Sequence, residues 1–140
     1  MLSRARIIAA IKEIYVRRVG GDKAEFAEIW AGGATYQLAG NEEIMGAALT
    51  RQRDARQAVG ELIDQFRFHR AELMDAVIDG NRAAAVVSLD VSTGGGPQHQ
   101  TQVFTLWEFD EDGKATSLVE FADTALIGAM VSQQQSAESR

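Results

Sequence analysis

Four apolar runs separated by short turn sequences fill the second half of the chain, and they limit its fold more than any other feature. The runs read FRFHRAELMDAVI, AAAVVSLDVS, HQTQVFTLWEF and ATSLVEFAD. Between them lie DGN (79–81), TGGGPQ (93–98) and DEDG (110–113). Glycine, asparagine and aspartate between apolar runs are typical of hairpin turns. The pattern therefore predicts a four-strand antiparallel meander.

The first half of the chain carries a helical periodicity instead. Apolar residues at Ile7, Ile11, Ile14 and Tyr15 repeat at intervals of three and four, and charged residues occupy most positions between them. This spacing predicts a helix over residues 3–18 with one buried stripe. The glycine pair that follows predicts the end of that helix.

Two further helices and a short strand are predicted before the meander. Asp22 is a suitable cap for a second helix that runs to about Ala31. The segment ATYQLAG then predicts a short strand, and Asn41 is a suitable cap for a third helix that ends near Gly60. The predicted buried side of the second helix consists of Phe26, Ile29 and Trp30.

Helices followed by antiparallel strands indicate an α+β fold, with the helices on one face of a curved sheet. A hydrophobic content of 46% over 140 residues is sufficient for one compact core. We expect a single domain over residues 1–131. The end of the chain, SQQQSAESR, is predominantly polar, so we expect a disordered tail over residues 132–140.

Composition disfavours several classes of function. A net charge of -6 repels phosphate backbones, so we expect no nucleic-acid partner. The chain has no cysteine, and its two histidines show neither HxH nor HExxH spacing, so we expect no metal and no cofactor. Lys12 and Glu13 interrupt the first apolar run before it reaches the length of a signal peptide or a membrane span. We therefore expect a cytoplasmic protein that does not associate with membranes.

Three segments, VGGDKAEFAEIWAGGATY, GNEEI and FDEDGKATSLVEFAD, together with the order of the elements, resemble the nuclear transport factor 2-like superfamily. That superfamily includes ketosteroid isomerases, limonene-epoxide hydrolases and SnoaL-like polyketide cyclases. The resemblance implies a cone-shaped α+β barrel, in which a strongly bent, mostly antiparallel sheet wraps around three N-terminal helices. It also implies an apolar pocket at the open end and a homodimer that forms through the sheet.

The ketosteroid isomerase pattern is not kept. By the resemblance, its aspartate base falls on Leu38, its tyrosine on Ile14 and its aspartic acid donor on Thr105. Leucine cannot accept a proton, so the pattern disfavours enolisation by that mechanism. Tyr15 lies one position from the tyrosine site.

The limonene-epoxide hydrolase pattern is kept in part. Its tyrosine matches Tyr36, its acid matches Asp90, and its base matches Glu120. Its asparagine position is Leu38 and its bridging arginine position is Ser88, so the groups that position water and link the two acids are missing. Glutamate in place of aspartate also moves the carboxylate by about an ångström.

Glu120, Asp90 and Tyr36 are the predicted catalytic residues. Strand alternation places Glu120 on one face with Leu118 and Ala122, and in the family this face lines the pocket, where desolvation would raise the pKa of the carboxyl. If Asp90 also faces inward, the two acids would share a proton near neutral pH. The alternatives are a Glu120 at the rim or paired with an arginine, and an outward Asp90, because periodicity does not distinguish inside from outside. A buried Tyr36 would need a water or a substrate oxygen as partner.

The predicted walls of the pocket mix aromatic, aliphatic and hydroxyl side chains. A dry core would show the same pattern. Asp123 is predicted to cap the C-terminal segment and to have no catalytic role. The predicted substrate-binding residues are Trp30, Leu38, Thr105, Trp107 and Leu118.

The sequence therefore predicts a protein with a pocket for a small apolar molecule. One hypothesis is a cofactor-free acid–base enzyme, either a hydrolase, a dehydratase, or an isomerase or cyclase. The other is a catalytically silent ligand-binding or dimerisation module of the same fold.

Overall fold

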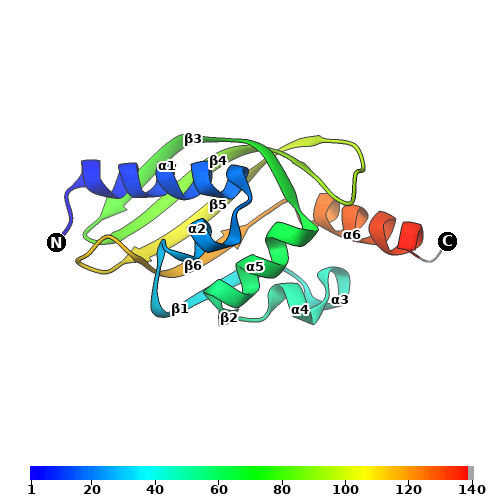
Figure 1. Cartoon of the computed structure of the whole chain (residues 1–140), viewed down its shortest axis with the longest axis horizontal. Helices are drawn as coiled ribbons and strands as arrows, with labels where there is room; N and C mark the ends of the chain where they lie inside the picture. The colour runs from blue at the N-terminus through cyan, green and yellow to red at the C-terminus, as the bar shows by residue number, and fades with distance from the viewer. Residues whose placement is uncertain (139–140) are drawn as a thin grey trace.

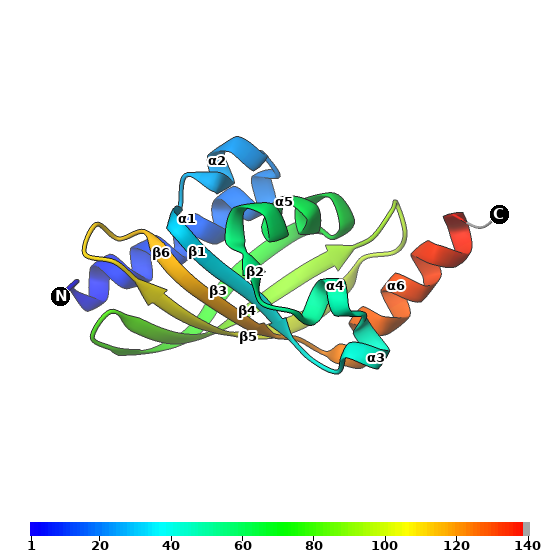
Figure 2. The same ribbon diagram turned by 90° about the horizontal axis from the view of Figure 1, so that it is seen from below.

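The computed structural model describes residues 1–138 and shows an α+β architecture in which helices lie over a curved sheet (Figures 1 and 2). Within this part of the chain, no helix is long and apolar enough to cross a lipid bilayer. In chain order the elements are α1 (Arg4–Gly20), α2 (Lys23–Ala27), β1 (Trp30–Ala39), α3 (Glu42–Met45), α4 (Ala47–Thr50), β2 (Arg53–Asp54), α5 (Ala55–Gln65), β3 (Arg67–Asp79), β4 (Arg82–Ser92), β5 (His99–Phe109), β6 (Ala115–Phe121) and α6 (Thr124–Glu138).

One six-stranded sheet has the order β2-β1-β6-β5-β4-β3. The predicted meander from β3 to β6 is confirmed, with every neighbouring pair antiparallel. β1 joins β6 in parallel, which sets Leu38 opposite Glu120. The sheet curves around α1, α2 and α5 on its concave face, and it stays open at β2 and β3 (Figure 2). The predicted α+β cone is confirmed, although the barrel is not closed.

The first helix follows the sequence pattern closely. Ser3 caps α1 by accepting the backbone N–H of Arg6, and Gly21 ends it at φ 75, in the left-handed region that glycine enters without strain. Ile7 and Ile11 are fully buried, because the apolar stripe packs on the concave face of the sheet.

The predicted second and third helices are partly wrong. α2 ends at Ala27, and Trp30 begins β1 instead of closing the helix. The predicted helix from 41 to 60 breaks at Gly46, which has a φ of 90, and a second cap at Asp54 starts α5, whose interior contains Gly60. The prediction missed Asp54, whose side chain accepts the backbone N–H of Gln57.

The chain ends in a helix. Asp123 accepts the backbone N–H of Leu126 at 3.1 Å, which confirms its predicted capping role. α6 then continues to Glu138, so the expectation of a disordered tail is wrong for residues 132–138. Residues 139–140 of the predicted tail lie outside the described residues.

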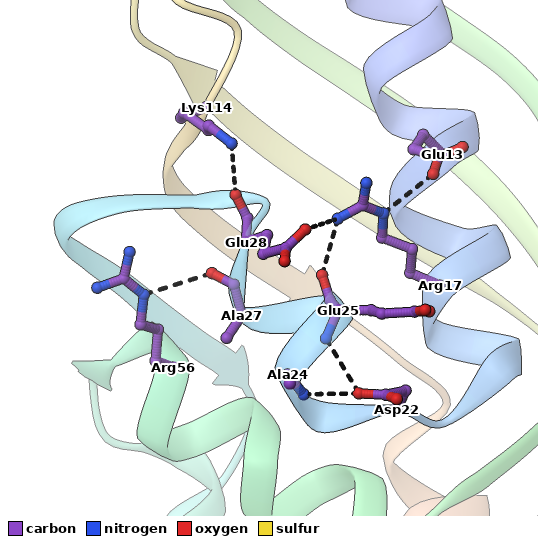
Figure 3. Close-up of polar contacts among 9 residues, drawn as sticks. All are labelled: Glu13, Arg17, Asp22, Ala24, Glu25, Ala27, Glu28, Arg56 and Lys114. Carbon is purple, nitrogen blue, oxygen red and sulfur yellow. Dashed lines mark hydrogen bonds and ion pairs between the residues drawn. The ribbon is translucent and has the colours of Figure 1, made fainter.

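Basic side chains from α1, α5 and the β5–β6 turn hold the carbonyl end of α2 (Figure 3). Arg17 Nη1 donates to the carbonyl of Glu25 at 2.8 Å, and Lys114 Nζ donates to the carbonyl of Glu28 at 2.6 Å. Arg56 Nε donates to the carbonyl of residue 27 at 3.4 Å. Positive charge at this end of a helix satisfies the free carbonyls and complements the helix dipole.

Stacked aromatic rings fill one end of the concave face, which we call the aromatic end and define by Trp30, Trp107 and Phe109. The ring of Trp107 stacks on Trp30 at 6.1 Å between centroids and on Phe109 at 5.8 Å. Tyr15 meets Trp107 edge to face at 6.2 Å. Trp30 and Trp107 are almost completely buried, so this end is a packed core.

The convex face of the sheet carries an exposed aromatic pair. Phe104 on β5 and Phe121 on β6 are about half exposed, and their rings meet edge to face at 6.3 Å between centroids. The homodimer implied by the resemblance would use this face of the sheet, and it stays a prediction.

Candidate functional site

A cavity lies under the concave face of the sheet, at the end near α6. Its hollow space reaches about 740 Å³ only when the open solvent at its mouth is counted, and about 70 Å³ of it can hold the centre of a water-sized sphere. Its lining side chains are mostly aliphatic and aromatic, and they come from the sheet and from α1, α2, α5 and α6. We call this region the cavity end and define it by Leu89, Val91 and Glu120. The charged side chains that line the cavity are Arg18, Glu120 and Asp123.

Glu120 sits on β6 with its carboxylate held by two phenols. The hydroxyl of Tyr36, on the neighbouring strand β1, donates to Oε1 at 2.7 Å. The hydroxyl of Tyr15, on α1, donates to Oε2 at 3.4 Å. Each carboxylate oxygen therefore has one phenol as a partner, and both phenols are almost fully buried.

The surroundings of Glu120 favour its protonated form. Burial raises the pKa of this carboxyl above its ordinary value, and it outweighs the hydrogen bond from Tyr36, the charge of Arg18 and the hydrogen bond from Tyr15, which lower the pKa. Burial and the neighbouring Glu120 raise the pKa of Tyr15 and Tyr36 well above that of a free phenol. Both tyrosines therefore stay neutral hydrogen-bond donors across the physiological range.

Arg18 brings a buried positive charge to the same cavity. Its side chain comes from the last turn of α1, and Nη2 donates to the carbonyls of Leu62 at 3.2 Å and Phe66 at 2.7 Å. Its guanidinium lies 3.9 Å from the centre of the Phe68 ring. Burial lowers the pKa of Arg18 to about 10, so the group remains a cation at neutral pH.

Besides Glu120, the structure places four of the predicted residues at the cavity and two in the core. Leu38, Trp107 and Leu118 line the cavity with Tyr36. Thr105 faces the same side of the sheet, but it is fully buried, and its hydroxyl accepts the indole N–H of Trp107 at 2.9 Å. Trp30 is not among the lining residues, because it is stacked behind Trp107 at the aromatic end.

Of the two positions left open for Asp90, the structure shows the outward one, so this predicted catalytic residue does not lie at the cavity. Its carboxylate accepts Nε of Arg70 at 3.1 Å on the convex face of the sheet. Ser88 shares that face and accepts Nη2 of the same arginine at 2.8 Å. The alternation of β4 points Leu89 and Val91 into the cavity, so Asp90 must point away.

Sequence reasoning underrated Tyr15 and missed Arg18. Tyr15 was expected on the buried stripe of the first helix and beside the isomerase tyrosine position, but not as the hydrogen-bond partner of Glu120 that it is. Arg18 continues the buried spacing of Ile7, Ile11 and Ile14, since it follows Ile14 by four positions. A charged residue on an otherwise apolar helix stripe was the signal that could have identified it.

The described side chains do not form a recognisable metal site. Within the part of the chain that the structure describes, no three histidine, cysteine, aspartate or glutamate side chains are grouped so that they could hold a metal ion. The only carboxylates among the described residues that line the cavity are those of Glu120 and, at the rim, the exposed Asp123.

Comparison with known proteins relates this geometry to a fold family. By sequence, no family model matches, and no curated protein matches either. By structure, the chain is similar to the BvnE pinacolase from Penicillium brevicompactum, with a TM-score of 0.74 and 14% identity over 98% of this chain and 99% of that one.

Two further solved structures give the same result. An NTF2-like protein of unknown function from Burkholderia pseudomallei has a TM-score of 0.71 and 15% identity over 92% of this chain and 98% of its own. SalBIII, an epoxide hydrolase/cyclase-like enzyme in pyran ring formation in the polyether salinomycin, has a TM-score of 0.69 and 16% identity over 87% and 94%.

These likenesses cover nearly the whole chain at low identity, so they establish the fold. The chain has the nuclear transport factor 2-like fold, and the predicted resemblance is confirmed at that level. The reaction is not fixed by the fold, because this architecture carries different chemistries on similar scaffolds.

Proposed function

We propose that the cavity is the active site of a cofactor-free acid–base enzyme that moves a proton on a small, largely apolar substrate. Glu120 is the group that takes up the proton and returns it. The observation that carries this proposal is the position of Glu120, a carboxyl held by two phenols in a cavity whose wall is mostly apolar.

The raised pKa of Glu120 suits this role. A general base works best when its pKa lies near the working pH, and burial shifts this carboxyl in that direction. An ionised carboxylate offers about four acceptor positions, and the two phenols use two of them. The remaining lone pairs are available for a proton from a substrate.

Tyr36 and Tyr15 act as positioning residues. Their hydroxyls fix both oxygens of the carboxylate, so the rotation of Glu120 is restricted from the side of β1 and from the side of α1. Because the phenols stay neutral, they keep donating while Glu120 changes its charge. The site is therefore organised before a substrate binds.

A proton-shift isomerisation fits this arrangement better than epoxide hydrolysis. The hydrolase pattern requires a second acid, and Asp90 is paired with Arg70 on the opposite face of the sheet. Asp123 is exposed at the mouth and serves as a helix cap. One carboxyl is sufficient when a C–H bond next to a carbonyl breaks, its proton moves to Glu120, and the same proton returns to another carbon of the substrate.

Hydrogen–deuterium exchange tests this step without knowledge of the natural product. The protein in D₂O is incubated with a panel of apolar cyclic ketones, such as 2-tetralone and cyclohex-2-enone, and exchange next to the carbonyl is followed by proton NMR. The wild type should accelerate exchange of at least one ketone. Glu120→Gln should reduce the rate by about 100-fold or more, the usual share of a general base.

Two further variants complete the test. One removes the phenol hydroxyl of Tyr36, and the other changes a carboxyl on the opposite face of the sheet as a control. Tyr36→Phe should reduce the rate by about tenfold, because the carboxyl loses its 2.7 Å partner. Glu108→Gln should leave it unchanged, since Glu108 pairs with Arg82 away from the cavity. A wild type that accelerates no exchange, or a Glu120→Gln variant that retains the wild-type rate, contradicts the proposal. Ligand binding without any exchange would favour the silent binding module.

A further inference from the structure

We propose that the cavity selects ligands with a negatively charged head group, such as a carboxylate or an enolate, on an apolar body, and that Arg18 binds this head group. The inference rests on the proposed function in that the cavity must be the ligand site, but it does not require Glu120 to catalyse a reaction. Its basis is an arginine that is almost fully buried, lines the cavity and has no acidic partner.

The guanidinium of Arg18 has unused hydrogen-bond donors. A guanidinium carries five N–H groups, and the two on Nη2 are used by the carbonyls of Leu62 and Phe66. Among the residues that the structure describes, Nε and Nη1 of Arg18 donate to no partner. Three donors therefore remain on a side chain that forms part of the cavity wall.

The charge of Arg18 is also uncompensated by contact. None of the ion pairs among the described side chains includes Arg18, and both oxygens of Glu120 are bonded to tyrosines instead. Burying a cation without an acidic partner is costly, and a buried anion in the cavity would recover part of that cost. Arginine is also well matched to oxyanions, because its planar donors bind carboxylates strongly.

The titratable groups around the cavity make the selection depend on protons. Tyr15 and Arg18 face it from α1, Tyr36 from β1, Glu120 from β6 and Asp123 from the exposed rim. The phenols are neutral and Arg18 is charged across the physiological range, so Glu120 is the deep group that can change. With Glu120 protonated, the deep cavity carries one positive charge; with Glu120 ionised, it carries none.

Binding of an anion should therefore be coupled to uptake of a proton by Glu120. An anion near this carboxyl disfavours ionisation, so it raises the pKa of Glu120 further. By linkage, the affinity for the anion should fall as the pH rises through the pKa of Glu120. Neutral ligands of the same shape should show little of this dependence.

Isothermal titration with three naphthalene probes tests the inference. The probes are 2-naphthoate, 2-naphthamide and 2-(aminomethyl)naphthalene, which share an apolar body and differ in the charge of the head group. The wild type should bind the naphthoate about tenfold or more tightly than the amide and should bind the ammonium most weakly. In two buffers of different ionisation enthalpy, only the naphthoate should show net proton uptake.

Variants separate recognition by Arg18 from its contacts with α5. Arg18→Met should reduce the preference for naphthoate over naphthamide to about twofold or less, and Arg18→Lys should keep part of it. Arg56→Met is the matched control, because Arg56 also donates to backbone carbonyls but does not line the cavity, and it should keep the full preference. Glu120→Gln should keep the preference and lose the proton uptake.

The inference is overturned if the wild type binds the naphthoate no more tightly than the amide, which includes the case in which neither binds. It is also overturned if a folded Arg18→Met keeps the wild-type preference. The wild-type comparison decides even where Arg18→Met does not fold. A clear preference for naphthoate without any ketone exchange would leave this inference standing and reject the proposed catalytic function, whereas exchange without a preference would do the reverse.

Discussion

The aromatic end and the cavity end share the same strands, yet one is filled and the other is hollow. β5 places Trp107 and Phe109 toward the aromatic end, and a few residues earlier it places Val103 and Thr101 beside the cavity. α1 crosses both ends, with Ile7 packed in the core and Arg18 at the cavity (Figure 1). The hollow therefore follows from side-chain size along continuous elements, and not from a missing helix or strand.

The two ends also differ in how their polar groups are satisfied. At the aromatic end the indole N–H of Trp30 is buried and has no hydrogen-bond partner in the described part of the chain. At the cavity end Glu120 is bonded to two phenols, and a guanidinium lies nearby with unused donors. The aromatic end therefore leaves one buried donor unpaired inside a packed core, whereas at the cavity end the unused donors of Arg18 lie in the cavity wall, where the proposed ligand would reach them.

The largest expected effect is on stability at the aromatic end. Trp107→Ala should lower the free energy of unfolding by about 3–5 kcal/mol, because the side chain is fully buried between two stacked rings. Leu89→Ala, beside the cavity, should cost only about 2 kcal/mol, because part of its surface already faces a hollow. Urea denaturation of both variants measures the difference. Equal losses would show that the two ends are packed alike.

Enlarging an alanine should have opposite consequences at the two ends. Ala85→Leu should destabilise the protein by about 1–3 kcal/mol, because Ala85 is almost fully buried beside Thr105. Ala122→Leu adds the same atoms to the cavity wall, so it should leave the stability unchanged or raise it by about 1 kcal/mol. Thermal unfolding checks the stability. The naphthoate titration should show weaker binding only for Ala122→Leu, and a destabilised Ala122→Leu would mean that the cavity is not free space.

The pH dependence of stability should distinguish Glu120 from an ordinary surface acid. Folding raises the pKa of Glu120, so the unfolded chain ionises first as the pH rises above about 4.5. The wild type should therefore lose stability relative to Glu120→Gln from that pH until the folded pKa is passed. Denaturation curves at several pH values measure this. If the difference in stability between the wild type and Glu120→Gln does not change with pH, Glu120 is solvated and its pKa is not raised by folding.

The smallest effect is expected on the convex face. Asp90→Asn removes a partly exposed pair with Arg70 and should cost less than about 1 kcal/mol. It should leave both ketone exchange and naphthoate binding unchanged, in contrast to Glu120→Gln. A large loss of ketone exchange or of naphthoate binding in Asp90→Asn would mean that Asp90 takes part in the site and that the two faces of the sheet do not differ as described.

Local patterns in the sequence were enough to predict much of this architecture. The turn sequences and apolar runs gave the meander, the stripe from Ile7 to Tyr15 gave α1, and the resemblance gave the cone. The break at Gly46 was not predicted. Asn41 and Asp54 are both suitable helix caps, so the sequence fits one long helix after Asn41 as well as a short helix there and a longer one after Asp54. Which cap begins a long helix depends on tertiary contacts.

The site was predicted less completely. The period-two alternation of β6 grouped Glu120 with Leu118 and Ala122, the resemblance implied that this face lines the pocket, and all three residues line the cavity. On β4 the run AAAVVSLDVS is apolar on both faces, so the sequence did not decide which face carries Asp90. The position of Arg18 on the apolar stripe of α1 could have indicated a buried cation, but its contacts with α5 and β3 at the cavity form only when these elements pack together.

The three cations at the carbonyl end of α2 have a consequence for the order of folding. A helix of five residues is too short to persist alone in water, and its carbonyls are held from residues that lie 8, 29 and 86 positions away in the chain. α2 should therefore be absent from the folding transition state and form only after α1, α5 and the β5–β6 turn have assembled. Substitutions in α2 should speed unfolding and leave the folding rate nearly unchanged. Phe26, which α2 brings to the cavity wall, would then be among the last side chains to reach its place.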